Sequence, residues 1–168
     1  MNQARIRPLV VLAAASLTCW GAWAGLRLDD SASPRARVPA QVALTESGRL
    51  LADAPFADAA VIKFGRIDYR LATSAYVGRK ARIYFVVPQF VTGLRSPSGL
   101  RVDWRGLGQL ASGSGRAGER QLVWSGLVAG PWFEESLELT AWVDLKQLQL
   151  PYNTPFAFEC FFEIETTP

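Results

Sequence analysis

The sequence predicts an all-β fold: a single antiparallel β-sandwich of about seven strands behind an N-terminal signal peptide. Apolar and polar residues alternate in several short segments, and turn residues separate those segments. No window keeps a 3.6-residue period over a dozen positions, so no long helix is expected. Short strands with regular turn signals are typical of sandwiches and barrels, and we expect an immunoglobulin-like architecture.

Residues 1–24 have the pattern of a signal peptide. Two arginines precede an apolar stretch over residues 9–20, and Ala22-Trp23-Ala24 supplies the small-x-small cleavage pattern. The stretch is shorter than the roughly 20 residues of a membrane-spanning helix, so cleavage is favoured over anchoring. A lipid-attachment site at Cys19 fits poorly, because the residues before it depart from the usual pattern.

Cleavage leaves 144 of the 168 residues, the size of one domain, in the periplasm or outside the cell. We divide this part into a flexible polar leader over residues 25–37 and a β-sandwich domain over residues 38–168. Cys160 is then the one cysteine, so no intrachain disulfide forms and packing must supply the stability.

The first three predicted strands cover residues 38–44, 61–73 and 81–87. Pro39 places the first at a sheet edge, because proline cannot donate a ladder hydrogen bond. The inward parity changes within the second strand, which predicts a β-bulge at Gly65-Arg66.

Two further strands flank a segment rich in glycine and serine. Ser96-Pro97-Ser98-Gly99 predicts a turn, after which residues 100–105 alternate between apolar and charged side chains. Residues 106–118 are the expected mobile loop. The strand over residues 120–129 is centred on Leu122 and Trp124.

The last two predicted strands, residues 137–145 and 156–165, show the clearest alternation, and residues 146–150 between them fit one helical turn. Cys160 shares its parity with four large apolar residues. We therefore expect a buried and unreactive thiol.

The composition excludes several chemistries. The chain has no histidine, which excludes Ser-His-Asp and Cys-His catalysis and His-ligated zinc. One remaining cysteine excludes thiolate zinc sites and iron-sulfur clusters. We expect no cofactor, no metal and no enzymatic activity. The remaining catalytic route is a pair of carboxylates, for which the available acids are Asp103, Glu134, Glu135 and Glu138.

Charge is divided along the chain. Residues 61–120 hold eleven Lys and Arg against three acids, whereas residues 121–168 hold one Lys against seven acids. If the two groups of strands are neighbours, the charges form cross-strand pairs. If they lie on opposite faces, the molecule is dipolar and suited to head-to-tail contact with copies of itself.

Six residues are candidates for contact with a partner or ligand, because they fall on outward parities or beside a turn: Trp132, Trp142, Tyr84, Arg82, Arg101 and Arg105. Exposed aromatic rings stack on sugars or anchor a partner, and arginine binds carboxylate and phosphate. Edge packing and a solvated outer face are the alternative interpretations of the same residues.

We expect a non-catalytic envelope or surface protein that acts through protein–protein contacts, such as a pilus-like or surface-assembly subunit. Its partners would be other envelope or surface proteins, or copies of itself. A glycan- or anionic-ligand-binding module is the alternative, and a carboxylate-dependent hydrolase is the second alternative. No nucleic-acid-binding motif occurs, and we expect no membrane span after signal cleavage.

Overall fold

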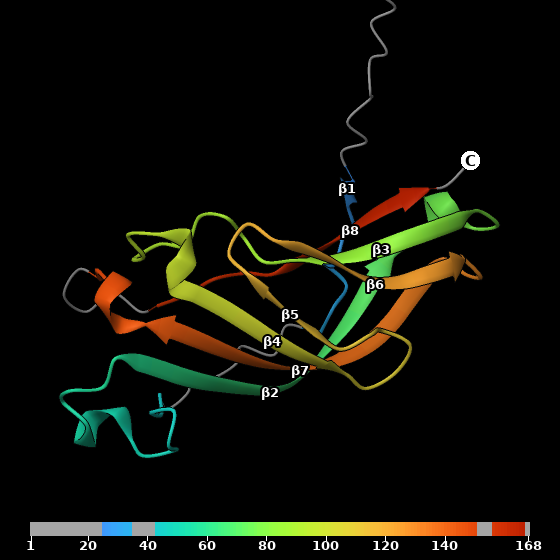
Figure 1. Ribbon diagram of the computed structural model, residues 1–168. Coiled ribbons are helices and arrows are strands. Elements are labelled where there is room, and N and C mark those ends of the chain that lie inside the picture. The colour runs from blue at the N-terminus through green and yellow to red at the C-terminus, as the bar shows by residue number, and fades with distance from the viewer. Residues whose placement is uncertain (1–24, 35–42, 151–155, 167–168) are drawn as a thin grey trace, which may run out of the picture.

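The computed structural model describes residues 25–34, 43–150 and 156–166. Its strands form two antiparallel four-stranded sheets (Figure 1). The first sheet has the order β1-β8-β3-β6 and the second sheet the order β2-β7-β4-β5. The all-β prediction is confirmed.

The strands of the first sheet are β1 (Leu26–Arg27), β3 (Lys80–Val86), β6 (Arg120–Leu127) and β8 (Phe161–Thr166). Those of the second sheet are β2 (Ala59–Ala72), β4 (Leu100–Gly106), β5 (Gly113–Arg116) and β7 (Trp132–Asp144). Short 3₁₀ turns lie between them: η1 (Leu51–Asp53), η2 (Ser74–Tyr76), η3 (Pro97–Gly99) and η4 (Leu145–Gln147). In the described ranges, no helix has the length and apolarity that a membrane crossing requires.

The strands pair in a nested order. β1 pairs with β8, β2 with β7, β3 with β6 and β4 with β5, which is the order of a jelly roll. An immunoglobulin domain keeps its last two strands together in one sheet, whereas β7 and β8 lie in different sheets here. The strand order therefore differs from that of the immunoglobulin-like architecture we expected. Alternation in the sequence identifies strands, but it does not indicate which distant strand each one pairs with.

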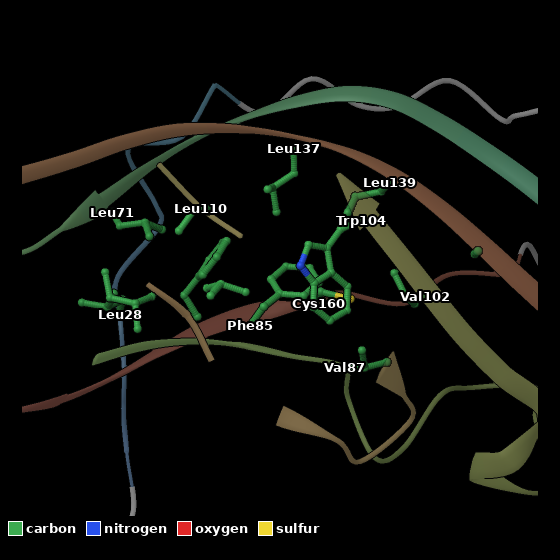
Figure 2. Close-up of a cluster of buried hydrophobic side chains, with 14 of the residues drawn as sticks. Leu28, Leu71, Phe85, Val87, Val102, Trp104, Leu110, Leu137, Leu139 and Cys160 are labelled. Atoms are coloured by element: carbon green, nitrogen blue, oxygen red, sulfur yellow. The ribbon is translucent and has the colours of Figure 1, made fainter. Parts of the chain in front are cut away.

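The two sheets pack face to face on one hydrophobic core (Figure 2). Phe85 of the first sheet packs against Trp104 of the second, with ring centroids 4.7 Å apart. Phe162 of the first sheet packs edge-to-face against Tyr69 of the second, with ring centroids 5.0 Å apart. Cys160 lies in this core at 7% exposure, as expected, and burial raises the pKa of its thiol to about 12.

The predicted bulge in β2 is found one residue earlier than expected. The register with β7 shifts between Lys63 and Gly65, so Phe64 is the extra residue. Gly65 adopts a φ of 72°, a conformation that glycine reaches without a steric penalty. The bulge returns both halves of the strand to the core, since Ile62, Phe64 and Ile67 all pack against it.

Two segments expected to lack structure contain strands. Leu26 and Arg27 form β1 and Leu28 is 2% exposed, so this part of the predicted flexible leader joins the first sheet. The predicted mobile loop over residues 106–118 contains β5. A strand made of Gly113, Ser114, Gly115 and Arg116 has no apolar alternation by which the sequence could reveal it.

β6 confirms the strand predicted at residues 120–129 but not its inward face. The register with β3 shifts at Val123, which is buried, and this leaves Leu122 49% exposed. Of the first predicted strand, residues 38–42 lie outside the described residues, as does the signal peptide over residues 1–24. Leu44 forms isolated bridges with Leu50 and Val61.

Candidate binding surface on the second sheet

The six residues singled out from the sequence fall on two different surfaces. Tyr84 and Arg82 lie on the outer face of the first sheet, in rows that contain Glu163 and Glu165. The other four lie on the second sheet: Arg101 and Arg105 on β4, and Trp132 and Trp142 at opposite ends of β7. Among these six residues, Arg101 and Trp142 are in contact.

Tyr84 belongs to a charged cluster on the first sheet. The Arg120 guanidinium lies 3.7 Å from the centroid of the Tyr84 ring and pairs with both Glu163 and Glu165. The Tyr84 hydroxyl donates to Glu165 at 3.0 Å. Partial burial raises the pKa of the Glu165 carboxyl, but the hydrogen bonds from Arg120 and Tyr84 outweigh it and lower that pKa. Internal packing therefore accounts for Tyr84.

The opposed charges of the two halves of the chain pair across neighbouring strands. Arg70 of β2 pairs with Glu134 of β7 at 3.1 Å. Arg105 of β4 pairs with Glu138 of β7 at 2.6 Å. These contacts confirm the cross-strand interpretation of the divided charge. As exposed pairs they are each worth at most about 1 kcal/mol, so they neutralise the surface more than they stabilise it.

Rows of side chains cross the outer face of the second sheet. The first row, in register across β2, β7, β4 and β5, is Val61, Trp142, Arg101 and Arg116. The second row is Lys63, Thr140, Asp103 and Ser114, and the third is Arg66, Glu138 and Arg105. The second and third rows hold polar side chains only, and Trp132 and Ala72 form the last row at the far end of β7 and β2. The middle of this face is therefore a polar surface.

Trp142 fixes the position of Arg101. The Arg101 guanidinium lies 4.6 Å from the centroid of the Trp142 ring and pairs with Asp103 at 3.2 Å. The Trp142 indole N–H donates to Asp103. Each of the three side chains contacts the other two, so an exposed guanidinium is held in one place. The tryptophan therefore orients an arginine, and this ring face is not free to stack on a sugar.

Arg116 stands directly opposite Arg101 in the β4–β5 ladder. Like charges in directly opposed positions destabilise an antiparallel pair. Asp103 compensates Arg101, whereas no ion pair joins Arg116 to any residue that the structure describes. The Arg116 guanidinium therefore lacks an ion pair at the edge of the second sheet, although the Glu119 carboxylate accepts the Arg116 backbone N–H at 2.9 Å. The sequence could not reveal this pairing, because it placed Arg116 in a loop.

A polar hollow of about 330 Å³, which we call the arginine hollow, opens beside these two arginines. Arg101 and Arg116 line its β4–β5 side, while Asp58 and Asp144 line its β2–β7 side. Lys146 pairs with Asp58 at 2.8 Å and donates its backbone N–H to Asp144. The volume lies at the lower end of the range of small-ligand sites.

A second polar hollow, of about 530 Å³, lies toward the other end of β7. Asp68 in its lining accepts hydrogen bonds from Ser136 and Arg66, which lower the pKa of its carboxyl. Arg70, also in the lining, lies 4.5 Å from the centroid of the Trp132 ring. Both ends of this face thus carry a β7 tryptophan covered by an arginine from a neighbouring strand.

Glu135 faces the interior and anchors the loop between β4 and β5. Only 7% of it is exposed, and its Oε1 accepts the backbone N–H of Gln109 at 2.9 Å. Glu134 and Glu138, on the opposite parity of β7, form ion pairs on the outer face. Of the four acids named for a hydrolase, Glu135 therefore faces the interior, whereas Asp103, Glu134 and Glu138 lie on the outer face.

Comparison with protein-family models, with curated proteins and with solved structures finds no match for this chain. Since no relative indicates a function, the function is argued from the geometry of the outer face of the second sheet.

Proposed function

We propose that this protein is an exported, non-catalytic module that binds a glycan or related anionic ligand along the outer face of its second sheet. The observation that carries the proposal is the polar strip along β7, by which we mean the outward residues between Trp132 and Trp142 and their neighbours on β2 and β4. A hollow lies at each end of this strip. In each hollow region an arginine is positioned over a tryptophan of β7, Arg70 over Trp132 and Arg101 over Trp142.

The dimensions of the strip suit an extended ligand. Trp132 and Trp142 are ten residues apart on one strand, which corresponds to about 33 Å. The side chains between them are hydroxyls, carboxylates, ammonium and guanidinium groups that exchange hydrogen bonds with sugar hydroxyls. Jelly-roll domains include lectins, which supports the proposal by analogy of fold alone.

Contact with an envelope or surface protein is the second candidate function. The internal charge pairing removes the dipolar argument for self-association, but Phe56 and Phe90 are 96% and 86% exposed. Their loops are both tied to the chain that follows β7, through the bonds from Leu145 to Asp58 and from Gln149 to Gly93. Exposed aromatic side chains at one end of a molecule suit the docking of a partner.

A face-blocking variant tests the leading proposal. Thr140 lies in the middle of the strip, between Lys63 and Asp103, so Thr140→Phe raises a ring into the path of the ligand. The matched control is Ser125→Phe, on an exposed position of β6 in the first sheet. On a glycan array, we expect the wild type and Ser125→Phe to bind the same glycans and Thr140→Phe to lose them.

Two outcomes would contradict this proposal. Glycan binding that survives Thr140→Phe would place the site elsewhere. A protein that binds no glycan, but captures an envelope protein in a manner lost on Phe56→Ser or Phe90→Ser, would favour the second candidate.

Export rests on the sequence of residues 1–24 alone. Expression of the full chain in a bacterium, followed by fractionation and N-terminal sequencing, tests it. We expect protein that begins at Gly25 in the periplasm or the medium. Full-length protein retained in the cytoplasm would contradict export.

A further inference from the structure

The pairing of Arg116 with Arg101 narrows the class of ligand. Directly opposed arginines repel each other, and Asp103 satisfies one of the two. An oxyanion placed between guanidinium groups converts the repulsion into a pair of charge-assisted hydrogen bonds. On the basis of the proposed function, we propose that the ligand is an acidic saccharide whose oxyanion binds between Arg101 and Arg116 in the arginine hollow.

The donors that this oxyanion needs are present. A guanidinium carries five N–H donors. Arg101 directs its Nε and Nη2 at Asp103, and its Nη1 makes no hydrogen bond with the described residues. The Trp142 ring and Asp103 hold this guanidinium in place, so little side-chain entropy is lost when a ligand binds. Arg116, exposed at the edge of the sheet, supplies the second guanidinium.

The opposite side of the hollow suits hydroxyl groups. Asp58 and Asp144 each engage Lys146 through Oδ1, and Glu46 also lines this side. Carboxylates accept hydrogen bonds from sugar hydroxyls and repel a second negative charge. A unit with one oxyanion and several hydroxyls, such as a uronic acid, therefore matches the hollow better than free phosphate or a densely charged polymer does.

Calorimetric titration at low salt, of the wild type and of Arg116→Gln, tests the inference. The probes are an oligomer of galacturonic acid, a galactose oligomer of the same length, and inorganic phosphate. We expect the wild type to bind the acidic oligomer about tenfold more tightly than the neutral one, and phosphate weakly. Arg116→Gln should lose this preference and keep the affinity for the neutral oligomer.

The control variant Arg79→Gln removes one positive charge from an exposed position before β3, away from the second sheet. It should keep the full preference, which separates the specific contact from the net charge. A sulfated galactose oligomer, as a further arm, distinguishes recognition of carboxylate from recognition of sulfate.

Each outcome has one meaning. Equal affinity of the wild type for acidic and neutral oligomers, with Thr140→Phe abolishing both, would overturn the oxyanion and leave the proposed function intact. Absence of binding to every oligomer would overturn both proposals. If phosphate binds as tightly as the acidic oligomer, the site recognises an anion and no sugar, which would also overturn this inference.

Discussion

Arginine is the residue that organises both outer faces. Among the described residues, four arginines cover aromatic rings, each within 5 Å of the ring centroid: Arg27 over Phe161, Arg70 over Trp132, Arg101 over Trp142 and Arg120 over Tyr84. All four also pair with a carboxylate. An exposed contact of this kind is worth about 0.5–1 kcal/mol. For these four strand residues the outward aromatic ring is therefore an arginine contact first, and it marks a ligand contact only where a second guanidinium lacks an ion pair.

The hydrogen bonds at Glu165 predict an acid-sensitive contribution to stability. The pKa of this carboxyl is lowered in the folded protein, so its contribution is present above the ordinary value of 4.5 and is lost as pH falls through the folded value. We expect Glu165→Gln to lose less stability than the wild type between pH 7 and pH 3, measured by urea denaturation. Glu159→Gln removes a more exposed partner, that of Arg27, and should follow the wild type.

Burial of Cys160 predicts an inert thiol. Its pKa of about 12 keeps the thiolate scarce at pH 8, and Phe64, Phe156 and Phe158 form part of the wall of the hollow that it lines. We expect a maleimide to modify the folded protein far more slowly than the same protein in urea. Equal rates in both conditions would contradict the position of this residue in the core.

At the scale of the element, β5 is the strand that alternation could not identify. Gly113 and Gly115 lie against Trp104, and added Cβ atoms would lie 2.8 Å and 3.5 Å from its ring. At Gly113 the indole occupies the space of a side chain, and at Gly115 a Cβ would meet Val87 at 3.3 Å before it meets the indole. β7 is the opposite case over residues 137–144, where strict alternation made the strand predictable, although its first five residues, 132–136, were not predicted.

The packing of β5 on Trp104 predicts that substitutions at the neighbouring positions 113 and 114 change the free energy of unfolding by different amounts. Gly113→Val introduces a contact with the indole that requires a shift, and should destabilise the protein by about 1–3 kcal/mol. Ser114→Val points outward, and should change the free energy of unfolding by less than about 0.5 kcal/mol. Chemical denaturation of the two variants beside the wild type measures the difference, and equal values would place β5 away from the indole.

How much of the site the sequence could reveal depends on pairing. The outward parity of Arg101 and Trp142 was readable, because each lies in an alternating strand. Their contact, and the placement of Arg116 opposite Arg101, arise from ladders between β4, β5 and β7, which are distant or irregular in sequence. Parity along one strand is a local property, whereas register between strands is set by the whole fold.

At the scale of the molecule, the nested pairing joins the two ends of the described chain. β1 lies at the edge of the first sheet beside β8, and Leu28 continues the pairing by donating its N–H to Phe162. The chain then crosses to the second sheet, where Asp29 accepts the N–H of Ala72. The segment from Leu26 to Asp29 thus links both sheets, although its composition resembles that of a leader.

This bridging role predicts that the side chain of Leu28 contributes more to the free energy of unfolding than a residue of the two-residue strand β1 before it. Leu28→Ala removes a side chain that is 2% exposed and leaves a cavity in the shared core, so it should cost about 2–5 kcal/mol in the free energy of unfolding. Leu26→Ala, at a position 63% exposed, should cost less than about 0.5 kcal/mol. Urea denaturation of both variants, with the wild type as reference, decides the matter. Equal and small effects would mean that the polar segment is a leader after all and that the first sheet stands without it. A large loss of stability confined to Leu28→Ala would mean that the packing of residues 26–29 beside β8 is needed to hold the two sheets together.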